Sequence, residues 1–237
     1  KDLNKTEARN YATKLISEAK KKGNKKWIAQ GYNDIGIVNL RNGNIDTALI
    51  SFQKSLKLRK ELNSPKDIVS SLAKIGNIYV EQLKYSDAIN LFIEASKISE
   101  KHGLQANLGL LYGNIATVYN TLNQYKLAIT YARKSLEIHQ AMQNKAGYGV
   151  CYSTIGSCMA DIGLYDSSLY YLEQAKVFLY EEGLYNEYCT AVNNLGQIHR
   201  KFNHSEKGIP YYIEAIKISK EIGDTLGFII YETNLAV

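Results

Sequence analysis

The residues best suited to covalent chemistry are Cys189 and His199, a thiol and an imidazole that could act as a nucleophile and its base. We expect both in one helix, where ten residues correspond to about 15 Å of rise, too far for a hydrogen bond. Cys151 and Cys158 form neither a CxxC pair nor the Cys/His spacing of a metal site. The sequence therefore predicts no catalytic residue, no metal site, no cofactor and no enzymatic activity.

A cluster of lysines and a cluster of tyrosines could instead bind a partner. The lysines could attract nucleic acid or an anionic membrane, but at a helix end they also complement the helix dipole, and no base-reading motif accompanies them. Exposed tyrosines often anchor protein interfaces, although tyrosine is common throughout this chain. We expect no nucleic-acid partner and leave the tyrosine cluster open. The residues are Lys20, Lys21, Lys22, Lys25 and Lys26, and Tyr170, Tyr171, Tyr180, Tyr185 and Tyr188.

The composition indicates a folded domain rich in regular structure, with 45% hydrophobic and 22% charged residues and two prolines among 237 residues. The longest apolar runs are far shorter than the roughly 20 residues of a membrane-spanning helix, so we expect no membrane span here. Residue 1 is lysine, and we expect the sequence to be a piece of a longer protein. The compartment is uncertain, with three buried thiols slightly favouring the cytoplasm over the periplasm.

The strongest pattern in the sequence is a repeat with a period of forty. Small residues that follow an aliphatic residue recur at this interval, and two more sets of small residues follow them twelve and nineteen positions later. Small side chains at fixed intervals predict points where two helices cross closely. The first set is Gly36, Gly76, Ala116, Gly156, Gly196 and Ala236; the second is Ala48, Ala88, Ala128, Ser168 and Gly208; the third is Ser55, Ala95, Ser135, Ala175 and Ala215.

Large residues between these positions have the spacing of amphipathic helices, so each unit is predicted to be a pair of helices. Glycine or asparagine, which tolerate the left-handed conformation that ends a helix, marks the breaks. The turn inside a unit contains Gly43, Asn123, Gly163 or Asn203, and the turn between units contains Gly23, Asn63, Gly103, Gly183 or Gly223.

The residues of one unit resemble the tetratricopeptide repeat family at Ile75-Gly76, Tyr79, Tyr85, Ala88, Phe92 and Ala95. The common 34-residue form of that family closes its second helix with proline, whereas the corresponding positions here hold Lys60, Glu100, Gln140, Tyr180 and Lys220. The longer form resembles the repeats of bacterial signalling proteins such as sensor kinases and regulators. The resemblance implies an all-α fold, a right-handed α-solenoid of helical hairpins.

We expect residues 1–237 to form a single array. Its five full repeats are 26–63, 66–103, 106–143, 146–183 and 186–223. Residues 1–22 would be the second helix of a truncated leading repeat, and residues 226–237 the start of a sixth. Such arrays bury their core only between neighbours, so we expect further repeats or another domain beyond the exposed ends.

The first helices are predicted to line a concave groove that holds a protein or an extended peptide. Positions not used by the core carry mostly uncharged polar side chains, and amides can pair with a peptide backbone of any sequence. The alternative is that a solvated helix face is polar in any case. The residues proposed to line the groove are Asn33, Ile37, Asn77, Thr117, Asn120, Ser157, Asn193, Gln197 and Arg200.

Two more specific expectations concern charge and helix geometry. Family members that hold a peptide's terminal carboxylate use lysine and arginine at positions that here are Ala73, Gly113, Ser153 and Thr117, so that clamp is not predicted. Pro210 falls inside a second helix, where it removes a backbone hydrogen bond, and predicts a kink or a late helix start.

The leading hypothesis is a protein- or peptide-binding module, the sensory or regulatory region of a larger bacterial signalling protein. The alternative is a structural scaffold that self-associates through its end repeats and has no dedicated ligand.

Overall fold

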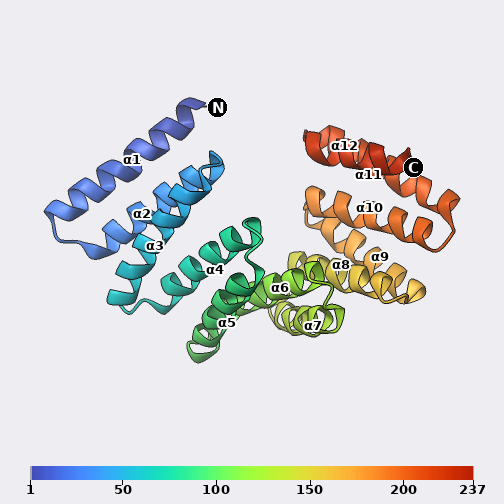
Figure 1. Cartoon of the computed structure of the whole chain (residues 1–237), viewed down its shortest axis with the longest axis horizontal. Helices are drawn as coiled ribbons and strands as arrows, with labels where there is room; N and C mark the ends of the chain where they lie inside the picture. The colour runs from blue at the N-terminus through green and yellow to red at the C-terminus, as the bar shows by residue number, and fades with distance from the viewer. Residues whose placement is uncertain (1, 237) are drawn as a thin grey trace. The chain divides into compact units, whose positions relative to one another are not determined.

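The structure is a computed structural model that describes residues 2–236 (Figure 1), and the side chains are described from residue 7 onward. Every regular element in this range is an α-helix, which confirms the all-α fold. The helices are α1 (Asp2–Lys21), α2 (Lys25–Arg41), α3 (Ile45–Glu61), α4 (Pro65–Glu81), α5 (Tyr85–Lys101), α6 (Gln105–Thr121), α7 (Tyr125–Ala141), α8 (Lys145–Asp161), α9 (Tyr165–Glu181), α10 (Tyr185–Lys201), α11 (Ser205–Ile222) and α12 (Thr225–Leu235).

Helices α2 to α10 each contain 17 residues, and a three-residue connection precedes the next helix. Two helices with their connections therefore reproduce the period of the sequence, as α2 begins at Lys25 and α4 at Pro65. The even-numbered helices are the first helices of the predicted hairpins and the odd-numbered helices are the second. Lys1 and Val237, at the ends of the predicted first and last segments, lie outside the described residues.

Each connection is closed by the same hydrogen bonds. At the end of α2, the Gly43 amide donates to the Leu40 carbonyl and the Asn44 amide to the Asn39 carbonyl, the Schellman pattern of a helix C-terminus. One residue has positive φ in each of the eleven connections, as predicted for the glycines and asparagines. Leu83 and Gln143 adopt the same conformation, which the sequence did not indicate, because each stands where the equivalent connection of other repeats has glycine or asparagine.

The chain divides into two compact units, unit 1 (Lys1–Leu111) and unit 2 (Tyr112–Val237). Within unit 1, α1 packs against α2, α2 against α3, α3 against α4, and α4 against α5. Gly36 and Gly76 lie directly against the rings of Phe52 and Phe92, which are fully buried. The predicted close crossing of first and second helices is therefore confirmed in this unit.

Unit 2 uses the same crossing with other side chains. Gly156 lies against Leu172, and Gly196 against Tyr212. Where the second helix carries the smaller Ala132, the first helix carries Ala116, and both belong to one buried cluster. Because the sizes of the two facing residues are matched in each hairpin, the helices can cross at the same place in successive hairpins.

Pro210 does not delay α11. This helix begins at Ser205, in register with the other second helices, and continues to Ile222, so the predicted late start is wrong. Pro210 is the sixth residue of the helix and is exposed. The carbonyl that loses its intrahelical donor belongs to Glu206 in the exposed first turn, where water can satisfy it.

Candidate functional site

The proposed groove residues all lie on first helices, but they differ in exposure. Asn77 and Thr117 are exposed, and Asn33 and Asn193 are only 5% exposed. The expectation that this helix position faces solvent is therefore wrong at Asn33 and Asn193. The partly buried members are Ile37 on α2, Asn120 on α6, Ser157 on α8, and Gln197 and Arg200 on α10.

In unit 2, side chains of this set connect one first helix to the next. The Asn234 amide on α12 donates to Asn193 Oδ1 at 2.8 Å. The Asn194 amide donates to Ser157 Oγ at 3.2 Å, linking α10 to α8. These amides and hydroxyls therefore help to hold the helix stack, which explains why Asn193 is buried.

Part of the predicted set does meet at a small cleft of about 130 Å³ between α8 and α10. Ser157 and Gln197 both line it, beside the ion pair of Lys201 with Asp161 at 3.0 Å. Asn193 and Arg200 are not among its lining residues. The cleft offers neutral donors and acceptors with one paired charge at its edge.

The thiols of unit 2 belong to its interior, as the repeat register predicted. All three are buried, and burial raises the pKa of Cys158 to about 12 and of Cys189 to about 11. Burial also lowers the pKa of His199, whose Nδ1 lies 2.8 Å from the Tyr165 hydroxyl. The thiols therefore stay protonated at neutral pH and provide no thiolate. Among the described residues, no group of three potential metal ligands lies together.

The tyrosine cluster separates into two places. Tyr170 and Tyr171 contact each other on α9, with ring centroids 5.4 Å apart. Tyr180 contacts Tyr188, which is buried and donates to a carboxylate oxygen of Glu214. These two groups do not form one aromatic patch, and partner binding by either stays a prediction.

Unit 1 contains a polar cluster around Arg59 that the sequence analysis missed. Arg59 on α3 is buried and donates to Ser71 Oγ at 2.8 Å and to the Asp67 carbonyl at 3.1 Å, both on α4. Its second terminal nitrogen lies 3.5 Å from Gln30 Oε1 on α2. The sequence could have indicated this cluster, because Arg59 places a charge at a core position. The corresponding positions of the other repeats hold Ser99, His139, Leu179 and Ser219.

Lys74 on α4 is the second cation of this cluster. Its side chain is partly buried and donates to Ser70 Oγ at 2.7 Å. Burial lowers the pKa of Lys74, and the positive charge of Arg59 lowers it further. In the part of the chain that the structure describes, Lys74 forms no ion pair with a carboxylate. Asp34 and Asp67 oppose both effects on the pKa of Lys74, so the ammonium group lies near carboxylates but is bonded to none of them.

Asn33 completes the cluster from α2. Its amide nitrogen donates to Asp34 Oδ1 at 3.2 Å, an oxygen that also accepts from Gln30 at 2.7 Å. The Oδ1 atom of Asn33 is buried without a hydrogen-bond partner. A buried acceptor without a donor usually costs about 1–3 kcal/mol. The cluster of Gln30, Asn33, Asp34, Arg59 and Lys74, called the α2–α4 polar cluster below, thus holds both an unmet acceptor and an unpaired cation.

The sequence matches a known family over most of these helices. The tetratricopeptide repeat family model matches residues 27–101 and 107–176, and a second tetratricopeptide repeat model matches residues 190–222. Because these matches cover more than half of the chain, it belongs to the tetratricopeptide repeat family. No curated protein matches the chain.

Solved structures share the fold at low identity. BtubC (BKLC) from P. vanneervenii is 17% identical, with a TM-score of 0.77 and 92% of each chain covered. A Rap protein complexed with Competence and Sporulation Factor is 18% identical at a TM-score of 0.77, covering 86% of this chain and 57% of that one. A STAND protein with a tetratricopeptide repeat sensor from Pyrococcus horikoshii is 18% identical at 0.78, covering 96% and 35%. At these identities the likeness concerns the fold, and this chain spans only part of the last two proteins.

Proposed function

We propose that this chain is a protein- or peptide-binding module that serves as the sensory or regulatory region of a larger signalling protein. The membership in the tetratricopeptide repeat family supports a binding role. Two similar structures, the Rap protein with its bound factor and the STAND protein with its repeat sensor, support a role in signalling. The regular helix starts, as at Tyr85, Gln105 and Tyr125, are consistent with the long form of the repeat.

The observation that supports this binding site is a pair of polar groups in the α2–α4 polar cluster that lack partners. In the described part of the chain, one is an acceptor without a donor, and the other is a cation without an ion pair. An acidic group of an extended polypeptide can pair with Lys74, and a main-chain N–H can donate to Asn33 Oδ1 once this buried side chain turns outward. Asp34 already accepts hydrogen bonds from Gln30 and Asn33, so it competes only weakly for the ligand's donors. The ligand is therefore an extended peptide with an acidic residue.

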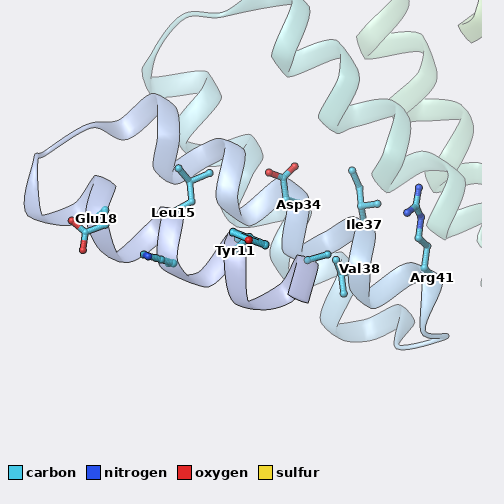
Figure 2. A pocket seen from close by; sticks show the side chains of 10 residues that line it. Tyr11, Leu15, Glu18, Asp34, Ile37, Val38 and Arg41 are labelled. Carbon is cyan, nitrogen blue, oxygen red and sulfur yellow. The ribbon is translucent and has the colours of Figure 1, made fainter. Parts of the chain in front are cut away.

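The remaining members of the predicted groove belong to the same proposal. Asn77 extends the site along α4 in unit 1, and Ile37 lies one turn after Asn33 on α2, where it lines the groove between α1 and α2 (Figure 2). In unit 2, we propose that Gln197 and Arg200 contact ligand, with Thr117 and Ser157 on the neighbouring first helices. Asn193 and Asn120 accept hydrogen bonds from Asn234 and Cys158, so we assign them to holding the helices.

Selection of peptides from a random library, followed by affinity measurement with purified variants, tests this site. Wild-type protein should enrich peptides that contain an acidic residue. Lys74→Ala should weaken their binding about tenfold or more, because loss of a poorly solvated charged partner typically costs about 2 kcal/mol or more. Asn33→Ala should weaken binding by a smaller factor.

The matched control is Lys66→Ala, which removes an exposed lysine from the same helix. Circular dichroism verifies that each variant is folded. Equal affinity of the wild type and both cluster variants, or enrichment of peptides without acidic residues, would contradict the assignment.

A further inference from the structure

A cleft of about 500 Å³ lies between the second helices α9 and α11 of unit 2, and it is called the α9–α11 cleft below. Val177 and Tyr180 of α9 line it and are 50% and 54% exposed. Ile218 lines it from α11, and the buried Tyr188 lines it from α10. The peptide site proposed above uses none of these residues, and Tyr180 and Tyr188 belong to the tyrosine cluster that the sequence left open.

Helix α9 differs from the other second helices at this surface. At the two positions of the repeat that hold Val177 and Tyr180, those helices carry only charged or polar side chains. Val177 and Tyr180 are three residues apart, so they are neighbours on the helix face. Neighbouring apolar side chains that stay exposed beside a hollow indicate a site of interaction. The corresponding residues are Ser17, Lys57, Lys97, Glu137 and Lys217 at the first position, and Lys20, Lys60, Glu100, Gln140 and Lys220 at the second.

Polar contacts between α9, α10 and α11 hold the walls of the cleft in place. Lys176 Nζ on α9 lies 2.8 Å from Glu214 Oε2 on α11, and the Tyr188 hydroxyl donates to Oε1 of the same carboxylate. The Tyr211 hydroxyl on α11 donates to Glu173 Oε1 on α9 at 2.7 Å. A site whose walls are fixed before binding loses less conformational freedom when a ligand enters. The cleft is therefore formed without its ligand.

The charges that line the cleft favour a cationic ligand. Lys176 and Glu214 neutralise each other, and the Glu181 carboxylate lies 3.6 Å from an ammonium group of α8. Glu173 is partly buried, and it forms no ion pair with any described residue. Lys217 also lines the cleft, but it is exposed, so water and salt screen its charge. The charge that a ligand meets in a fixed position is the carboxylate of Glu173.

The distance between the charged and the apolar parts of the cleft indicates the size of the ligand. Glu173 and Tyr180 are seven residues apart on α9, which corresponds to about 10 Å along the helix axis. One lysine or arginine side chain is too short to fill the apolar part and reach Glu173 as well. The ligand therefore carries two separate groups, an apolar one and a cationic one, as a polypeptide segment does.

We propose that the α9–α11 cleft binds a segment of a partner protein that carries a large apolar side chain and a nearby lysine or arginine. The apolar side chain packs between Val177, Tyr180 and Ile218, and the cation pairs with Glu173. The chain then has two binding sites of opposite charge preference. The α2–α4 polar cluster in unit 1 selects an acidic residue, and the α9–α11 cleft in unit 2 selects a basic one.

Selection from a random peptide library tests the proposal, with the full 237-residue chain carrying Lys74→Ala as the bait. This bait lacks the cation of the α2–α4 polar cluster, so the outcome does not depend on the function proposed for that cluster. The selected peptides should contain both a large apolar residue and a lysine or arginine. The affinity of the most enriched peptide is then measured with purified variants of the bait.

Two changes in α9 separate the apolar and the charged contributions. Val177→Ser with Tyr180→Gln introduces the neutral residues that other second helices have at Ser17 and Gln140, and should weaken binding about tenfold or more. Glu173→Gln keeps an acceptor for the Tyr211 hydroxyl but removes the charge, and should weaken binding about fivefold or more.

The matched control is Ile50→Asn, because Ile50 on α3 is also 50% exposed and the next repeat has Asn90 at this position. It should leave the affinity unchanged, and circular dichroism verifies that each variant is folded. The proposal is overturned if no peptide is enriched, or if the enriched peptides lack a basic or a large apolar residue. Unchanged affinity in either α9 variant, or an equal loss in Ile50→Asn, also overturns it.

Discussion

Units 1 and 2 have the same backbone repeat, but at one position of it they bury a charged side chain and an apolar side chain, respectively. Arg59 in unit 1 and Leu179 in unit 2 occupy the same position of a second helix, and both are buried. Arg59 donates to Ser71 on the next helix, whereas Leu179 packs on Gly149 of its own hairpin. The repeat therefore allows either a charged or an apolar residue at this position. The condition is that the facing residue can bond or pack with it.

The polar groups of the two units also differ in how completely they are paired. In unit 2, Asn193, Asn194 and Ser157 are joined to neighbouring helices by hydrogen bonds. In unit 1, Asn33 Oδ1 has no donor and Lys74 has no carboxylate partner among the described residues. Buried groups left unmet in a folded protein carry a free-energy cost that a ligand can remove. This difference directs the search for a ligand to unit 1.

Placing an arginine at the equivalent position of unit 2 should have the largest effect on stability. Leu179→Arg buries a charge without the acceptor that Ser71 offers to Arg59, because the corresponding position in unit 2 is Ala191. We expect a loss of about 3–5 kcal/mol from the free energy of unfolding of unit 2. Urea denaturation, monitored by the hydrogen exchange of amides in unit 2, measures the loss. The reverse change, Arg59→Leu, should alter the stability of unit 1 much less, because a well-packed apolar residue can replace a buried charge. Equal losses in the two variants would show that the position itself, not its partners, sets the cost.

The helix crossings provide the next test. In Gly76→Ala, the added methyl group overlaps the Phe92 ring, so we expect unit 1 to lose about 1–3 kcal/mol. Unit 2 tolerates alanine at this place because Ala116 faces the small Ala132. In a double-mutant cycle, Phe92→Ala should therefore cost less in the Gly76→Ala background than alone. Additive losses would contradict the size match.

Acid should affect unit 2 more than unit 1. Burial lowers the pKa of His139 and of His199, with Lys207 and His204 adding to the effect at His199 and Glu173 opposing it. Below pH 6.5 the unfolded chain then binds more protons than the folded one, so stability falls as the pH drops. The slope is at most about 1.4 kcal/mol per pH unit for each histidine.

Urea titrations between pH 7 and pH 5 check this expectation, with far-UV circular dichroism for the whole chain and Trp27 fluorescence for unit 1. Replacing both buried histidines by glutamine should flatten the pH dependence. His102→Gln, an exposed histidine of unit 1, is the control and should leave it unchanged. A pH dependence that appears first in the Trp27 signal would contradict the prediction.

The smallest difference concerns ion pairs between second helices. Lys60 and Glu94 in unit 1 are about half exposed, whereas Lys176 and Glu214 in unit 2 are mostly buried and 2.8 Å apart. We expect Lys60→Met to change stability by less than about 0.5 kcal/mol and Lys176→Met to cost about 1 kcal/mol. Thermal unfolding of the two variants in low and high salt distinguishes the two ion pairs. Equal shifts of the unfolding temperature would show that the pairs contribute equally.

Much of the fold could be read from the spacing of small and apolar residues. The period of forty, the hairpins and the left-handed turns at Gly43 and Asn123 all follow from local rules about helix faces and helix ends. The burial of the three thiols was expected from the sequence and is confirmed. Leu83 was missed as a turn residue because its own propensity opposes the conformation that its register imposes.

The candidate site was predicted only in part. Asn33 was selected as a polar residue of a first helix, and it lies on α2, but its burial was not foreseen. Arg59, Asp34 and Lys74 were not selected at all. Their contacts join three helices and reach from Gln30 to Lys74, and a pattern read along one helix carries no information on them.

The sequence by itself determined where helices begin, end and cross, because those choices depend on side-chain size and backbone conformation at regular intervals. Only the tertiary structure decided which polar groups are satisfied. Hydrogen bonds and ion pairs form over a few ångströms between residues of different helices, so the unmet acceptor of Asn33 becomes visible only when neighbouring helices are in place.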